Sequence, residues 1–169
     1  LVKDCQENIP STEIPSHAKR GYPKGFGDDR LITPETELKY VLNFENNQLD
    51  TAIRMVIRDT LSPFLDPTTV RPGARSHDFT YEVTGEGILK FTFEDINLPP
   101  GGSASSRGFV KYTVSQKPDN PGGALIKNGA AIFYNFGHPN FTENTCHKIE
   151  DFVRVSTEEI FHPAVEQVK

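Results

Sequence analysis

The sequence predicts an all-β protein, an antiparallel β-sandwich of about seven strands, and three observations support this prediction. Apolar and polar residues alternate along most of the apolar segments between residues 38 and 136, which is the pattern of half-buried strands. Thirteen Gly and thirteen Pro are clustered between those segments, as in proteins built from short strands joined by turns. The apolar residues include twelve Phe but no Trp and one Met, a composition that favours strands over helices.

The first two alternating segments, residues 38–45 and 52–60, are separated by the turn-forming stretch NNQLD. We therefore predict that they pair as a hairpin. The side chains expected to face the core are Leu38, Tyr40, Leu42 and Phe44 in the first strand, and Ile53, Met55 and Ile57 in the second.

The following segments alternate in the same way. Residues 77–84 and 88–95 flank the stretch GEG and are predicted to form a second hairpin. A Gly/Ser/Pro-rich loop over residues 97–108 precedes the remaining strands. The side chains expected to face the core are Phe79, Tyr81, Val83, Leu89, Phe91, Phe93, Val110, Tyr112, Val114, Ile132, Tyr134, Phe136, Ile149, Val153 and Val155.

Short strands at regular spacing favour an immunoglobulin-like sandwich, with a closed barrel as the alternative. We place this domain at residues 31–155. Residues 1–30 are rich in Pro, Gly, Ser and charge, and we expect an extended lead-in that packs on the sandwich or links it to a neighbour. Residues 156–169 are expected to be a C-terminal linker.

Several classes of function are disfavoured. A net charge of −5 without a basic stripe argues against nucleic-acid binding. No apolar run approaches the ~18 residues needed to span a membrane. The motifs of serine hydrolases, zinc proteases and P-loop NTPases are absent from the sequence, so we predict no catalytic residue and no enzymatic activity.

Two weak ligand-binding hypotheses remain. Asp59 and Asp66 could supply oxygen ligands to a calcium ion at one end of the sandwich, although solvated carboxylates in turns are the favoured explanation. No other cofactor is expected. Tyr22 and Phe141, with Phe26, lie outside the strand pattern and could bind a surface polysaccharide, or could cover an edge of the core.

The two cysteines, Cys5 and Cys146, lie near opposite ends of the chain and in no metal or redox motif. We predict that they form a disulfide, which suits an oxidising compartment. Closing a loop of roughly 140 residues would contribute at most about 5 kcal/mol in the chain-entropy model. The alternative is two separate buried thiols.

Several motifs occur in order: CQENIP near the start, ELKYVLNFENNQLDTAIRMVIRDTL from residue 37, GILKFTFEDINLPPG from residue 87, and GGALIKNGAAIFYNF from residue 122. Together they resemble the repeat-like domain that precedes the sorting domain in secreted and surface proteins of Bacteroidota. The resemblance is carried by Leu38–Leu61 and Gly123–Phe136, and extends from about Cys5 to Ile149.

The resemblance implies an immunoglobulin-like fold, export from a Gram-negative bacterium by type IX secretion, and an extracellular or cell-surface location. It implies no enzymatic activity. We therefore predict a structural spacer module whose partners are neighbouring domains of the same precursor. One alternative is an adhesion module that binds calcium or a surface polysaccharide. Another is an assembly subunit that self-associates by donating its N-terminal segment as a strand.

Overall fold

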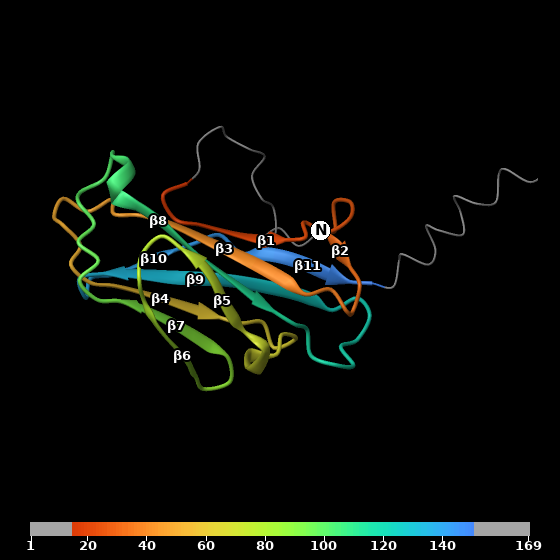
Figure 1. Cartoon of the computed structure of the whole chain (residues 1–169). Coiled ribbons are helices and arrows are strands. Elements are labelled where there is room, and N and C mark those ends of the chain that lie inside the picture. Colours follow the sequence, from red (N-terminus) through yellow and green to blue (C-terminus); the bar gives the residue numbers. More distant parts are fainter. Residues whose placement is uncertain (1–14, 151–169) are drawn as a thin grey trace, which may run out of the picture.

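The computed structural model describes residues 15–150, which form strands and two short 3-10 helices. Figure 1 shows how these elements are arranged. Within these residues no helix is long and apolar enough to cross a membrane. The elements in chain order are β1 (Ala18–Tyr22), β2 (Leu31–Ile32), β3 (Leu38–Glu45), β4 (Met55–Thr60), η2 (Pro67–Thr69), β5 (Arg71–Arg75), β6 (Thr80–Thr84), β7 (Ile88–Phe93), η3 (Ala104–Ser106), β8 (Arg107–Val114), β9 (Leu125–Tyr134), β10 (Pro139–Phe141) and β11 (Thr145–Ile149).

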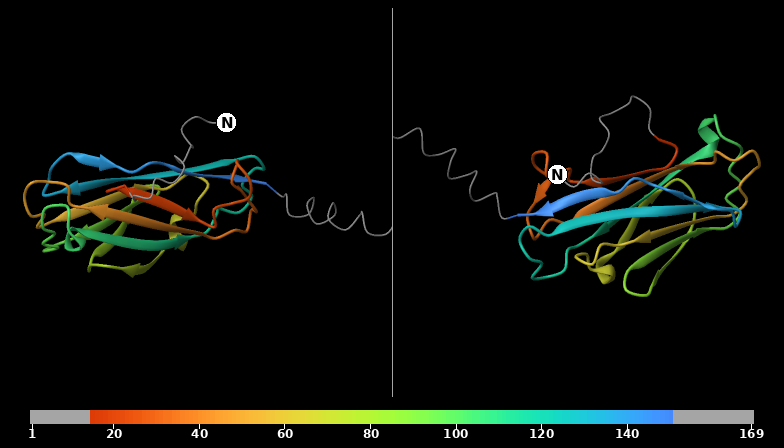
Figure 2. Two further views of the ribbon diagram at one scale, coloured as in Figure 1. Left: turned by 90° about the horizontal axis from the view of Figure 1, so that it is seen from above. Right: turned by 180° about the vertical axis from the view of Figure 1, so that it is seen from behind.

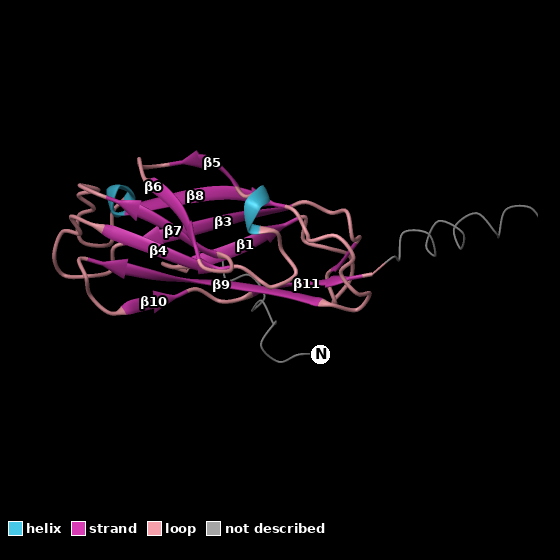
Figure 3. Ribbon diagram, turned by 90° about the horizontal axis from the view of Figure 1, so that it is seen from below, coloured by secondary structure: helices cyan, strands magenta, loops and turns pink. Residues whose placement is uncertain are grey.

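The strands form two sheets that pack face to face (Figures 2 and 3). The smaller sheet has the order β1-β3-β8-β5, and β1 is one of its edges. The larger sheet has the order β2-β11-β9-β4-β7-β6, with β10 paired to β9 beside this path. All pairings are antiparallel except that of β2 with β11. The architecture is thus the immunoglobulin-like sandwich that the sequence predicted.

Alternation along the strands produces the core. Every second side chain is buried along β3 and, from Val110 onward, along β8, and in β9 the same pattern continues over ten residues. Aromatic side chains from both sheets meet in the middle: the ring centroids of Tyr40 and Tyr112 lie 5.3 Å apart, and those of Phe91 and Tyr112 lie 5.9 Å apart. These separations are typical of favourable aromatic pairs.

Two predictions about pairing have different outcomes. The hairpin over residues 77–95 is confirmed, because β6 pairs with β7 from Thr80 to Thr84. The hairpin over residues 38–60 is wrong, because β3 belongs to the smaller sheet and β4 to the larger one. The stretch between them crosses from one sheet to the other instead of making a tight turn. The number of strands was also underestimated, at about seven against the eleven found in the described residues.

Three side chains expected in the core are exposed. Ile53 is 56% exposed because it lies in the crossing segment before β4 begins. Phe136 is 83% exposed because β9 ends at Tyr134 and the chain turns through positive φ angles at the next two residues. Val83 is 42% exposed on β6, the edge strand of the larger sheet. Val153 and Val155 lie outside the described residues.

The domain boundaries stay predictions, but the segment 1–30 contains a strand that was not expected there. Residues 18–22 form β1, which pairs along its whole length with β3. The first described part of the lead-in is therefore built into the smaller sheet.

Candidate functional site

A lysine and an aspartate meet in the centre of the sandwich. Lys19 comes from β1 in the smaller sheet and Asp59 from β4 in the larger one. The Lys19 Nζ atom lies 2.5 Å from Asp59 Oδ2, and both side chains are completely shielded from solvent. The pair is the one ion pair among the described residues in which both side chains are fully buried.

The strand registers explain why these two side chains point inward. Lys19 is opposite Leu42 of β3, which is a core residue. Asp59 follows Met55 and Ile57 at two-residue steps, so it lies on the same buried face of β4. Its partners across the ladder are Leu89 of β7 and Ala130 of β9, which are buried as well.

Hydrogen bonds and aromatic rings enclose the pair. The Tyr112 hydroxyl donates to Asp59 Oδ2 at 2.8 Å and accepts from Lys19 Nζ at 3.1 Å. It also accepts from Asn128 Nδ2 at 3.2 Å. The Lys19 Nζ atom lies 4.4 Å from the centre of the Tyr40 ring, within the range of a cation–π contact.

The buried surroundings change the protonation equilibria of these groups. Burial lowers the pKa of Lys19 to about 8, although the nearby Asp59 carboxylate opposes this shift. Burial, followed by the charge of Asp59, raises the pKa of Tyr112 well above its ordinary value, and the pKa of Tyr40 also rises. Both tyrosines therefore remain neutral hydroxyls at physiological pH, and the lysine is more easily deprotonated than a lysine in water.

The structure separates the two proposed calcium ligands by environment. Asp59 is buried against Lys19, whereas Asp66 is on the surface, where its Oδ1 accepts hydrogen bonds from the backbone and hydroxyl of Thr68 at the start of η2. Within residues 15–150 no group of three or more His, Cys, Asp or Glu side chains is placed to hold a metal. The calcium hypothesis stays a prediction without support from this geometry.

The two aromatic residues predicted to bind a ligand are both accessible but lie in different sheets. Tyr22, at the end of β1, is 37% exposed, and Phe141, in β10, is 74% exposed. Phe141 contributes to a groove of about 940 Å³ on the outer face of the larger sheet. The groove is lined by Arg58, Thr60, Thr84, Ile88, Lys90, Lys127, Gly129, Ala130, Ala131, Phe141, Thr142 and Asn144.

Cys146 is buried in β11, at 3% exposure. Its predicted partner, Cys5, lies outside the described residues, so the disulfide stays a prediction.

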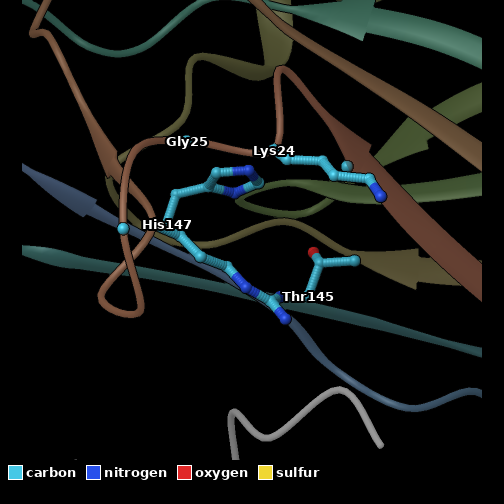
Figure 4. Close-up of a pocket in the computed structure, with 7 residues that line it drawn as sticks. Lys24, Gly25, Thr145 and His147 are labelled. Atoms are coloured by element: carbon cyan, nitrogen blue, oxygen red, sulfur yellow. The ribbon is translucent and has the colours of Figure 1, made fainter. Parts of the chain in front are cut away.

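A second, smaller pocket of about 220 Å³ lies beside the end of β1. Figure 4 shows His147 and Thr145 of β11 next to the loop that carries Lys24 and Gly25. The His147 ring donates from Nε2 to the Pro23 carbonyl at 2.9 Å. This hydrogen bond joins the loop after β1 to the other sheet.

The central cluster was largely missed from the sequence. Lys19, Tyr112 and Asn128 were not singled out as site residues, and Asp59 was considered only as a calcium ligand or a solvated carboxylate in a turn. The burial of Asn128 and Asp59 could have been predicted from the sequence, because each lies an even number of residues from predicted core positions in its strand.

Comparisons with solved structures show the fold. It is an immunoglobulin-like fold that is also found in domains of bacterial surface proteins. The major pilin subunit BcpA of Bacillus cereus is similar with a TM-score of 0.58 and 15% identity, over 81% of this chain and 41% of that one. The domain of ACE from Enterococcus faecalis, described as binding its ligands by the collagen hug model, has a TM-score of 0.50 and 13% identity, over 83% of this chain and 51% of that one.

The chain belongs to the family described as a domain of unknown function, DUF7619, whose model matches residues 24–148. No curated protein sequence matches the chain. The structural neighbours are pilin and adhesin domains, and the chain spans about half or less of the two described above.

Proposed function

We propose that this domain is a non-enzymatic, force-bearing spacer in a surface-exposed protein. In this role it keeps neighbouring domains of the same chain at a distance from the cell surface. The observation that carries the proposal is the path of the chain. Figure 1 shows β1 and β11 side by side and running in the same direction, so that the described chain enters at one end of the sandwich and leaves at the other.

This path determines how a pulling force acts. The hydrogen bonds of an antiparallel ladder lie perpendicular to the strands. Tension applied through the two ends pulls β1 and β11 in opposite directions along their axes, so the bonds of each ladder are loaded together. A force applied at one end of the sandwich would instead open the bonds one after another.

The test is single-molecule pulling of the full chain within a polyprotein. The first geometry pulls through the chain ends. The second pulls through cysteines introduced at Leu49 and Phe136, which are exposed loop residues at one end of the sandwich. A spacer built for tension will unfold at a several-fold higher force in the first geometry. Equal forces in the two geometries would contradict the proposal.

The groove that contains Phe141 favours a second function, binding of an acidic surface polysaccharide. The groove combines the exposed Phe141 ring with the cationic side chains of Arg58 and Lys127, which provide stacking and positive charge for such a ligand; a third cation there, Lys90, is paired with Glu82. Binding to a glycan array should be lost with Phe141→Ala and kept with Phe136→Ala, since Phe136 is also highly exposed but lies outside the groove. Binding that survives Phe141→Ala would exclude the groove as the site.

The family resemblance supports a Gram-negative origin in Bacteroidota and export by type IX secretion. If the parent protein is exported this way, it will accumulate inside cells of a strain in which that system is deleted. The assembly alternative concerns residues 1–14, which lie outside the described residues, whereas residues 18–22 pair within their own sheet. A shift from oligomer to monomer on deleting residues 1–14, read by size-exclusion chromatography, would support that alternative.

A further inference from the structure

The contact between Lys19 and Asp59 is closer than an ordinary ion pair. Charge-assisted hydrogen bonds from nitrogen to a carboxylate are about 2.7–2.9 Å long, and here the separation is 2.5 Å. The second carboxyl oxygen, Asp59 Oδ1, is buried without a hydrogen-bond partner among the described residues. Both oxygens of a buried carboxylate ordinarily accept hydrogen bonds, from the protein or from ordered water.

As ions, the two groups are in a costly place. Taking an ammonium and a carboxylate out of water costs several kcal/mol each, and the attraction between them repays this only when every lone pair and proton is satisfied. Asp59 Oδ1 does not meet that condition. An amide has no charge and needs fewer partners.

We infer that Lys19 and Asp59 are joined by an amide bond between Nζ and Cγ, a covalent cross-link that connects β1 of one sheet to β4 of the other. This modification is independent of the spacer function proposed above, since the bond could form in a domain that never bears force.

The reaction balances without any other reagent. Proton transfer within the pair converts the ammonium and the carboxylate into an amine and a carboxylic acid. The Lys19 nitrogen attacks Cγ, the Nζ–Cγ bond forms, and the Cγ–Oδ2 bond breaks. Oδ2 leaves as water with two protons, and Oδ1 becomes the carbonyl oxygen of the amide.

Tyr112 is placed to move the proton that this reaction requires. Its hydroxyl donates to Oδ2, the leaving oxygen, and accepts from Lys19 Nζ. It can therefore pass its own proton to Oδ2 and take one from the nitrogen, which leaves the hydroxyl unchanged. The hydrogen bond from Asn128 Nδ2 fixes the orientation of the hydroxyl.

The burial of Lys19 and its contact with Asp59 both favour the reaction. A lysine in apolar surroundings is more readily neutral and nucleophilic, and the pKa of Lys19 is lowered to about 8. Holding the two reacting groups in contact replaces a collision in solution with an intramolecular step. In water, amines and carboxylates at neutral pH remain as ions.

The same chain contains a matched control. Lys90 Nζ lies 2.6 Å from Glu82 Oε1, almost the same separation, but these side chains are 30% and 53% exposed. That pair is solvated, so it stays a salt bridge in spite of its short separation. The comparison separates the effect of burial from the effect of distance.

The test is the mass of the intact, denatured and reduced 169-residue chain at a resolution that separates water from ammonia. We expect the wild-type chain to be lighter than its sequence by one water molecule. Lys90→Met should retain this loss, and Lys19→Met should abolish it. An unchanged wild-type mass would overturn the inference. So would a loss of ammonia, because it would identify the Asn128 side chain as the group attacked.

A peptide digest locates the bond even if the Lys19 variant fails to fold. Trypsin should not cut after Lys19 in the wild type, and the segment ending at Arg20 should remain attached to the one beginning at Asp59. Two separate peptides would overturn the inference. In the pulling experiment, the linked chain should extend by roughly 130–140 Å less than its full length, because the 39 residues from 20 to 58 stay behind the cross-link.

Discussion

Replacing Lys19 and Asp59 together distinguishes a covalent link from an ion pair by its effect on stability. The double variant Lys19→Met/Asp59→Leu replaces both charged groups with apolar side chains of similar shape and removes the nucleophile. If the pair were only ionic, exchanging it for apolar side chains would leave the free energy of unfolding about the same or raise it by about 1–4 kcal/mol.

A covalent link predicts the opposite sign. Joining residues 19 and 59 closes a loop of about 40 residues, which lowers the entropy of the unfolded chain by about 13 cal/mol/K, or about 4 kcal/mol near room temperature. The double variant loses this contribution, so its free energy of unfolding should fall by about 4 kcal/mol.

Urea denaturation followed by circular dichroism measures this difference. The control variant Lys90→Met/Glu82→Gln removes the exposed pair, and its stability should change by no more than about 1 kcal/mol. A double variant at positions 19 and 59 that is as stable as the wild type, or more stable, would refute the reasoning.

Three further predictions concern Tyr112, Gly21 and His17. In Tyr112→Phe the proton relay is lost, so intact-mass measurements should find a larger share of unlinked chains than in the wild type; complete linkage would exclude the relay. A Cβ atom at Gly21 would lie 2.6 Å from the His147 ring, so Gly21→Ala should cost about 1–3 kcal/mol in a thermal melt, whereas Gly73→Ala, with its nearest contact at 3.6 Å, should not. Burial lowers the pKa of His17 below its ordinary 6.5, so the unfolded chain binds more protons there and stability should fall as the pH drops through this value. His17→Gln should flatten this dependence in urea titrations, and an unchanged slope would contradict it.

The sequence identified most of the core because alternation alone determines which face of a strand is buried. Tyr40, Phe91 and Tyr112 were all assigned correctly on that basis. Alternation does not determine which sheet a strand joins, however. The pairing of residues 38–45 with residues 52–60 was therefore wrong, although the buried faces of both segments were mostly right.

The central cluster was hidden for a different reason. Lys19 lies in a short strand within a Pro- and Gly-rich segment, and a lysine in such a segment is normally solvated. Nothing in the local pattern indicates that this lysine is buried, because its partner, Asp59, is forty residues away in the other sheet. Asp59 itself lies on the buried face of β4, and extending the alternation by one step would have placed it in the core.

The position of the cross-link also has a consequence for local stability. Among the described residues β1 is an edge strand that pairs with β3 alone, so without the bond it would be one of the first strands of the smaller sheet to open. A bond from Lys19 to β4, which lies between two neighbours in the larger sheet, prevents β1 from separating without global unfolding. Amide hydrogen exchange in Ala18–Tyr22 should therefore be as slow as in β3 in the wild type.

The double variant at positions 19 and 59 should behave differently. Under conditions where the whole domain remains folded, exchange in Ala18–Tyr22 should become faster by local opening, while exchange in β9 should change only as much as global stability does. Mass spectrometry of the exchanged peptides reads both segments in one experiment. If exchange accelerates equally in β1 and β9 of the double variant, the link contributes to global stability but does not hold the edge strand. If β1 exchanges equally slowly in the wild type and in the double variant, the link neither stabilises the domain nor holds β1.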